Sequence, residues 1–294
     1  MTDGDCPGDG IDWIEAWRCR QRRHRTSSTY RDGRHLWSRE ENARRYDASS
    51  RDEYGPRVAE TIAGLPLSPT ARVLDIGAGP GTLALPIARQ VQEVIAVEPA
   101  EGMTTVLAGH LERDKVRNVR IVRKRWEDVD PAVDLNPPYE IVIASFSVTM
   151  EEIDEALLKM DAVAAPGGMV ALYWFLDPSF YDLASGALWP GLHGSPYHGG
   201  PRADLLFLVL VQLGFLPRVE VLEFERTYRF GTMDEALDYF SPSLSIEDER
   251  GRSLLRDYLE GLARPGRDGG VVLRHPSRYA RVWWQKRGTP GTGA

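Results

Sequence analysis

The 294-residue sequence has little cysteine and no long apolar run. Its two cysteines, Cys6 and Cys19, lie near the N-terminus, which argues against a disulfide framework or a zinc ribbon and predicts free thiols in a reducing compartment. The longest strongly apolar stretch, Leu205 to Leu213, is far shorter than the roughly 20 residues that cross a bilayer, so it predicts a buried helix. The acidic, glycine-rich N-terminus is not followed by an apolar signal segment. We therefore expect a cytoplasmic protein with no membrane partner.

Basic residues, 36 in number, are outnumbered by 43 acidic ones. The net charge of -7 argues against a protein that binds nucleic acid through a basic face. One local exception lies around His24 and consists of Arg18, Arg20, Arg22, Arg23 and Arg25. Such a run is usually a solvated helix or an arm, and less often a contact for an anion or RNA. Both interpretations stay open from the sequence.

Strand and helix patterns alternate through the middle of the chain, and 42% hydrophobic residues supply a core. We expect strands at 72–76, 93–98, 119–122, 140–146 and 169–175, with helices at 81–90, 101–112 and 151–165 between them. This order is typical of a parallel sheet with helices on both faces. Helices at 204–214, 233–240 and 246–262 and strands at 219–225 and 279–284 are expected to follow.

Two segments depart from this alternation. Residues 1–65 predict an N-terminal arm and a helical lid, with Pro56 in the first turn of one lid helix. Residues 66–294 then form the main domain. Within it, residues 177–201 are rich in proline, glycine and aromatic side chains, and we expect an insertion there after the fifth strand.

The strongest chemical signal is RVLDIGAGPGT, residues 72–82. A buried strand runs into Gly77, Gly79 and Gly81 and then into a helix, so the backbone can turn sharply and a ligand can approach it closely. A dinucleotide fingerprint requires a further glycine where Thr82 stands, which makes the spacing G-x-G-x-G. Glu98 ends the second expected strand, where a carboxylate holds a ribose diol.

Together with AVEPAEGM, RWEDVD, YEIVIAS and APGGMVAL, this stretch resembles the class I S-adenosylmethionine-dependent methyltransferases, in particular the methyltransferase type 11/12 group. The resemblance covers about residues 40–230. It implies a Rossmann-like three-layer α/β/α sandwich with a mostly parallel seven-stranded sheet and an antiparallel last strand. It also implies the cofactor S-adenosyl-L-methionine, with S-adenosyl-L-homocysteine as product.

The resemblance assigns a role to each part of the cofactor site. Asp75 and the glycine turn would face the methionine part, Glu98 the ribose hydroxyls and Met103 the adenine. Family members usually carry Asp-Ala where this chain has Arg125-Trp126, so the adenine amine must be met by Glu127, Asp128 or water, while Trp126 either stacks or packs. The expected cofactor-binding residues are Asp75, Gly77, Ala78, Gly79, Gly81, Glu98, Pro99, Met103, Trp126, Glu127 and Ser145.

Asn136-Pro137-Pro138-Tyr139 spells a motif with which amino-methyltransferases hold a target amine. That chemistry requires the motif after the fourth strand, beside the sulfonium, whereas here the expected strand follows Tyr139. We therefore expect these residues at the opposite end of the sheet from the cofactor. Residues 145–150 occupy the working position and offer no obvious general base, so no catalytic residue is predicted.

Candidate acceptor residues come from the lid, the end of the fourth strand, the fifth strand and the insertion. They are Trp37, Ser147, Tyr173, Trp174, His193, Tyr197 and His198, with Trp189 in the insertion and Tyr46 and Tyr54 in the lid as further contacts. The alternative is that these aromatic residues form a small core. The two insertion histidines lack a carboxylate or thiol at clear spacing, so no metal is expected.

These features predict a methyltransferase that acts on a small-molecule acceptor. A protein or RNA methyltransferase, a nucleotide-binding oxidoreductase and a non-catalytic sensor that binds S-adenosylmethionine are the alternatives. Fold alone does not choose among acceptors.

Overall fold

A mixed sheet forms the centre of the computed structural model, which describes residues 10–27, 37–53, 55–266 and 269–288. Cys6 and Tyr54 lie outside the described residues. Seven strands follow the order β3-β2-β1-β4-β5-β8-β6, and the short β7 pairs with β8. The strands are β1 (Arg72–Ile76), β2 (Glu93–Val97), β3 (Val119–Val122), β4 (Tyr139–Ser145), β5 (Ala164–Phe175), β6 (Arg218–Phe230), β7 (Arg264–Pro265) and β8 (Val271–Gln285).

The first five strands are parallel, and β8 runs antiparallel to both of its long neighbours, β5 and β6. The predicted fold class is confirmed. Side chains alternate between the two faces of the central strands, so that Leu74 packs in one core cluster and Val73 in the other. Both faces are apolar because helices cover both of them.

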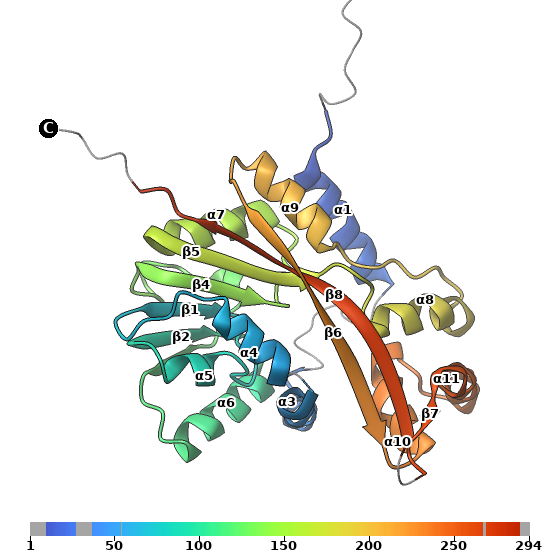
Figure 1. The fold of residues 1–294 in the computed structure, drawn as a ribbon. Helices are drawn as coiled ribbons and strands as arrows, with labels where there is room; N and C mark the ends of the chain where they lie inside the picture. Colours follow the sequence, from blue (N-terminus) through green and yellow to red (C-terminus); the bar gives the residue numbers. More distant parts are fainter. Residues whose placement is uncertain (1–9, 28–36, 54, 267–268, 289–294) are drawn as a thin grey trace, which may run out of the picture.

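Helices lie in layers on the two faces (Figure 1). One layer contains α1 (Trp13–Thr26), α7 (Ile153–Val163) and α9 (Ala203–Gln212), and the other contains α4 (Gly55–Ala63), α5 (Ala84–Ala88) and α6 (Glu101–Arg113). Helix α3 (Glu40–Glu53) packs on α6. These N-terminal helices pack directly on the helices of the main domain. The division of the chain at residue 65 stays a prediction.

The insertion after β5 is more regular than predicted. Helix α8 (Phe180–His193) occupies much of it. Ser179 and Asp182 form a reciprocal capping box at its start, and Gly194, with a φ of 67°, ends it. The many proline, glycine and aromatic residues of this segment do not form a recognisable helical pattern, so the sequence did not predict the helix.

A second insertion, which the sequence did not predict as such, separates β6 from β8. It contains α10 (Met233–Phe240), η2 (Ser241–Leu244), α11 (Glu249–Leu262) and β7. Its apolar side packs on α8 and on β6 and β8, and Phe180 and Phe240 are among the buried residues of the resulting third core cluster. In Figure 1 this unit lies beyond the end of β5, on the extended part of β6 and β8.

Both strands of this extension are longer than predicted. The register runs from Arg218 opposite Trp283 to Phe230 opposite Val271, whereas β5 pairs with β8 only as far as Phe175 opposite Tyr279. Residues 223–230 and 271–278 therefore form a two-stranded ribbon that leaves the sheet. We call this segment the ribbon.

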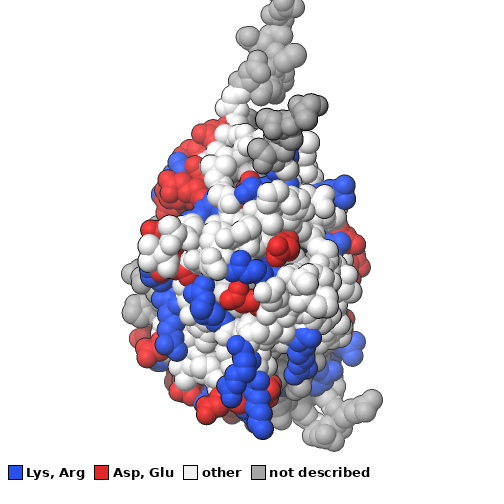
Figure 2. All heavy atoms as spheres, turned by 90° about the vertical axis from the view of Figure 1, so that its left-hand side faces the viewer, with Lys and Arg blue, Asp and Glu red and all other residues white. Residues whose placement is uncertain are grey.

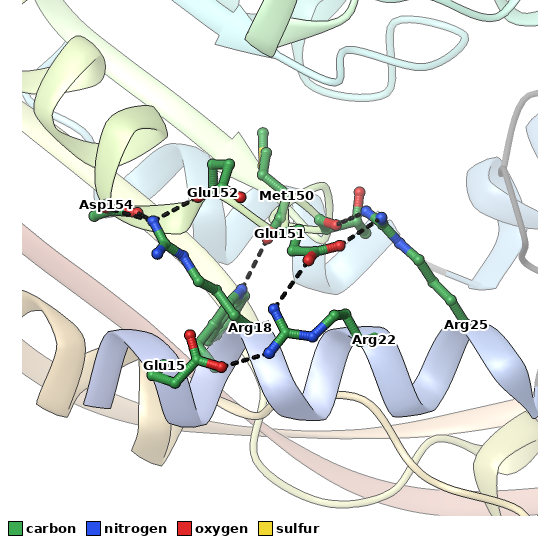
Figure 3. Close-up of polar contacts among 10 residues, drawn as sticks. Glu15, Arg18, Arg22, Arg25, Met150, Glu151, Glu152 and Asp154 are labelled. Atoms are coloured by element: carbon green, nitrogen blue, oxygen red, sulfur yellow. Dashed lines mark hydrogen bonds and ion pairs between the residues drawn. The ribbon is translucent and has the colours of Figure 1, made fainter. Parts of the chain in front are cut away.

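Helix α1 holds the chain that follows β4 (Figure 3). Trp17 is fully buried and donates from Nε1 to the carbonyl oxygen of Met150 at 2.8 Å, and Gln21 donates to the carbonyl oxygen of Thr149 at 2.7 Å. The basic run serves the same contact. Its ion pairs join Arg18 to Glu152 and Asp154, Arg22 to Glu15 and Glu151, and Arg25 to Glu151.

The α1 contact rests mainly on Trp17, because partly exposed ion pairs contribute less than about 1 kcal/mol each. We expect Trp17→Ala to lower the free energy of unfolding by about 3–5 kcal/mol through the cavity it leaves. Trp17→Phe keeps most of the apolar contact and loses the hydrogen bond, and should lower it by about 1 kcal/mol. Urea unfolding measures both, and equal losses in the two variants would contradict this account.

Candidate active site

The glycine turn lies at the carboxyl end of β1 and is fixed to its neighbours. The backbone N–H groups of Gly77 and Ala78 donate to the carbonyl oxygen of Val97 at 2.7 and 3.1 Å. Ser147 donates from Oγ to the carbonyl oxygen of Ile76 at 2.6 Å. A Cβ on Gly77 would lie 2.2 Å from Cβ of Ser147, whereas a Cβ on Gly79 would meet nothing within 4 Å. Gly77 is thus needed for packing, and Gly79 leaves open space for a ligand.

Glu98 faces this turn from the end of β2. Its buried carboxylate accepts from the backbone N–H of Gly79 at 2.9 Å and of Ala100 at 2.8 Å. Burial raises the pKa of Glu98 while these two hydrogen bonds oppose the shift. The carboxylate is therefore held in one orientation, with further lone pairs on its oxygens available to a ligand.

Asp75 lies behind the turn and is buried. Among the described residues its Oδ2 has no hydrogen-bond partner. Burial, and then the nearby charge of Glu98, raise the pKa of Asp75 to about 7. An orphaned carboxyl oxygen beside a glycine turn is a feature that a cationic or hydrogen-bonding ligand would satisfy.

A cavity of about 570 Å³ opens above the turn. Of the expected cofactor residues, Gly77, Gly79, Glu98, Pro99, Met103, Trp126, Glu127 and Ser145 line it, while Asp75, Ala78 and Gly81 do not. Trp126 also donates to the carbonyl oxygen of Ala156 at 3.1 Å, and its ring lies 5.0 Å from Nζ of Lys159. Packing, one of the two roles expected for Trp126, is therefore part of what it does.

The expected acceptor residues divide in two. Trp37, Ser147, Trp174 and Tyr197 line the cavity, as do Tyr46 and Trp189, whereas Tyr173, His193 and His198 do not. Tyr173 is fully buried against α4, where burial raises its pKa to about 12. His193 bonds to the carbonyl oxygen of Leu244 at 2.9 Å, and His198 faces α1 through Arg23 at 3.2 Å. Each of the three is turned away by a contact with another element.

The residue that follows β4 is strained. Phe146 has a φ of 56°, in the left-handed region that L side chains rarely adopt. The guanidinium of Arg57 lies 4.8 Å from the centre of its ring, and Phe175 packs on the ring at 4.6 Å. Strain of this kind persists where surrounding contacts impose it, and it concentrates at functional sites. The position after β4 is thus apolar with a cation beside it.

Sequence reasoning missed the distal wall of the cavity. Phe224, Arg226 and Tyr228 from β6 and His275 and Ser277 from β8 line it. They occupy alternate positions on paired strands, and the register places Phe224 opposite Ser277 and Arg226 opposite His275. Alternation along both strands was the available signal, and the predicted strands stopped short of it.

The Asn-Pro-Pro-Tyr motif lies at the amino end of β4, as predicted. Tyr139 is fully buried and pairs with Ala164 at the start of β5. Its hydroxyl accepts from the backbone N–H of Asn136 at 3.1 Å, and the guanidinium of Arg72 lies 5.0 Å from its ring. None of the four motif residues lines the cavity. The motif lies in the loop that enters β4 and at the first residue of that strand.

Within the described residues, no group of three or more His, Cys, Asp or Glu side chains is arranged to hold a metal ion. None of the described helices is long and apolar enough to span a bilayer.

Residues 73–168 match the family model of a methyltransferase domain. This part of the chain is an S-adenosylmethionine-dependent methyltransferase domain. Its glycine turn, open face at Gly79, buried Glu98 and orphaned Asp75 fit this cofactor, which combines a ribose diol with cationic groups.

Known proteins similar to this chain include an uncharacterized protein, an enzyme that acts on a release factor and a solved structure. An uncharacterized protein of Haemophilus influenzae is 25% identical over 252 residues, which is 79% of this chain and 87% of that protein. The release factor glutamine methyltransferase of Shewanella oneidensis is 27% identical over 190 residues, or 57% of this chain and 58% of that enzyme. The solved structure of the YcgJ protein of Bacillus subtilis superposes with a TM-score of 0.54 at 16% identity, covering 79% of this chain and 98% of that protein.

The close contact between Gly77 and Ser147 predicts that a substitution at Ser147 partly rescues a substitution at Gly77. Gly77→Ala should weaken binding of S-adenosylhomocysteine by about tenfold or more, because the new Cβ meets Ser147 and the left-handed backbone costs about 1–2 kcal/mol. Adding Ser147→Gly removes the clash and should restore part of the affinity. Isothermal titration calorimetry tests this, with Ser147→Gly alone as control. No recovery in the double variant would count against the packing role of Gly77.

Asp75 predicts a pH dependence of stability. Its folded pKa of about 7 exceeds the ordinary value of 3.8, so the folded chain keeps a proton that the unfolded chain releases. The free energy of unfolding should therefore fall as pH rises from about 4 through 7, by up to about 4 kcal/mol at 1.36 kcal/mol for each pH unit. Asp75→Asn removes this contribution, so its stability relative to wild type should increase with pH. Urea unfolding at pH 5 to 8 measures this difference, and a difference independent of pH would refute it.

Proposed function

We propose that this methyltransferase transfers a methyl group from S-adenosylmethionine to a small, largely planar acceptor bound in the cavity. The observation that carries the proposal is that segments from many parts of the chain enclose the cavity. Segments from α1, α4, the strand ends, α8 with the loop after it, and the ribbon all contribute lining residues. A space of about 570 Å³ enclosed in this way has the size of a small-molecule site.

In this proposal the half of the cavity next to the glycine turn, the proximal half, holds the cofactor. The cofactor supplies an electrophilic methyl group. Glu98 accepts from the ribose hydroxyls, and Met103 and Trp126 contact the adenine. The open face of Gly79 admits the methionine part of the cofactor, while the buried carboxyl of Asp75 lies behind the turn. The chain contributes alignment and exclusion of water, which supply much of the acceleration in a displacement at a methyl carbon.

The distal half is rich in aromatic side chains. Several of these rings pack on one another. The aromatic lining residues of this half are Phe175, Phe180, Tyr181, Trp189, Tyr197, Phe224 and Tyr228. Flat aromatic walls favour a planar acceptor by stacking and by burying its apolar surface.

Protein and RNA acceptors are the main competing possibility, and one relative methylates a release factor. Three observations favour a small molecule instead. The Asn-Pro-Pro-Tyr motif lies outside the cavity, and three arginines of the basic run pair with acidic side chains of the same chain. On the face drawn in Figure 2, basic and acidic side chains intermingle, without the basic surface that draws nucleic acid.

The proposal is tested by incubating the protein with methyl-labelled S-adenosylmethionine and cell extract, then separating small molecules, protein and nucleic acid. We expect label in the small-molecule fraction. Glu98→Ala should abolish it through lost cofactor binding, and Glu101→Ala, an exposed carboxylate three residues away, should not. Label in protein or RNA would overturn the acceptor class. Cofactor binding without any labelled product would favour a sensor.

A further inference from the structure

His275 faces the cavity from a position outside residues 73–168, which match the family model. It lies on the ribbon, opposite Arg226 in the register and two residues from Ser277, and all three line the distal wall. Ser277 is buried, and its Oγ has no hydrogen-bond partner among the described residues. The wall therefore offers a histidine ring and a neighbouring hydroxyl to whatever occupies this half.

The protonation of the His275 ring follows from its partner. Nε2 lies 3.1 Å from the carbonyl oxygen of Pro178, which can only accept. Nε2 must therefore carry a proton, and in the neutral ring Nδ1 then keeps its lone pair. Phe180 packs edge-on against the ring at 6.0 Å and restricts its rotation. Nδ1 is thus an oriented proton acceptor.

The surroundings favour the neutral form of the ring. Burial lowers the pKa of His275, and the positive charge of Arg226 on β6 lowers it further. The carbonyl of Pro178 and the carboxylates of Asp177, in the loop before α8, and Asp182, on α8, act in the opposite direction. Asp177 pairs with Arg278, and Asp182 accepts from Tyr197, so both carboxylates are already engaged.

We propose that His275 is the general base of this methyltransferase and that its acceptor is a hydroxyl compound, either a phenol or an alcohol. The inference rests on the proposed function, since it requires a small acceptor in the distal half of the cavity. Ser277 donates to the acceptor and helps to orient it. A hydroxyl acceptor requires removal of its proton, whereas thiolates and amines need little such help, so a neutral oriented imidazole fits the hydroxyl class.

The reaction balances without a further reactant. A lone pair of the acceptor oxygen forms a bond to the methyl carbon, and the carbon–sulfur bond breaks with its electron pair going to sulfur. The hydroxyl proton passes to Nδ1 of His275, directly or through one water. The products are a methyl ether, S-adenosylhomocysteine and an imidazolium, which returns its proton to solvent.

The first test needs no acceptor. In ¹⁵N-histidine-labelled protein saturated with S-adenosylhomocysteine, NMR should show His275 as the neutral Nε2–H tautomer at pH 7, with a pKa below the ordinary 6.5. His275→Gln assigns the resonance. A protonated ring or the Nδ1–H tautomer at pH 7 would overturn the proposal whatever the substrate.

The second test uses the small-molecule fraction of cell extract and methyl-labelled S-adenosylmethionine. His275→Gln keeps a donor for Pro178 but lacks the basic nitrogen, and it should slow label transfer by about 10²–10⁴-fold, the range of general base catalysis. Affinity for S-adenosylhomocysteine should be unchanged. His193→Gln is the matched control, because His193 also bonds to a backbone carbonyl and lies outside the cavity.

The pH profile separates a base from a positioning residue. The His275→Gln rate should rise with pH as the acceptor ionises in solution, while wild type should be nearly level above the pKa of His275. Mass spectrometry should identify a methyl ether. Equal rates in the two histidine variants, or a product methylated on nitrogen, sulfur or carbon, would refute the role of His275 and leave the proposed function standing. Absence of any labelled small molecule would remove both.

Discussion

Antiparallel hydrogen bonding between β6 and β8 gives the cavity its distal wall. The pairing continues for the full length of β6, past the last residue at which β5 pairs with β8. Since neighbouring strands in a ladder present alternate side chains to the same face, this continuation carries a row of cavity-lining residues beyond the sheet edge. The cofactor half of the cavity is built by the parallel strands. The distal half exists because the ribbon extends past them.

Helix α1 joins two sides of the cavity. One flank contacts residues 149–154, and its last turn contacts the loop after α8, where His24 donates from Nδ1 to the carbonyl oxygen of His198 at 2.8 Å. Gln21, His24 and Arg25 also line the cavity. Four arginines of the basic run, Arg18, Arg22, Arg23 and Arg25, are therefore engaged in contacts within the chain.

The alternating core and the position of Glu98 beside the glycine turn were predictable from the sequence. Local chemistry fixes them: a buried strand, glycines that allow positive φ and an acidic strand end lie within about thirty residues of one another. The position of Asn-Pro-Pro-Tyr was also predictable, since it depends only on which side of a strand the motif falls.

The distal half depends on long-range pairing, which local patterns do not reveal. Polar and charged residues alternate along β6 because one face of the ribbon is solvated, so the apolar signal ended before the strand did. The orientations of Tyr173, His193 and His198 also depend on long-range contacts. Their residue types suit a pocket, but a carbonyl or a side chain from a distant segment turns each of them elsewhere.

Phe180 and Tyr228 line the cavity and are also buried members of the third core cluster, which joins α8, α10 and α11 to the ribbon. The same side chains therefore shape the cavity and hold two insertions together. A substitution that enlarges the cavity at either position also removes packing from that core, so selection for a new acceptor acts against folding. Reshaping the cavity at Phe180 or Tyr228 would therefore require compensating packing changes in α10 and α11, far along the chain from the glycine turn.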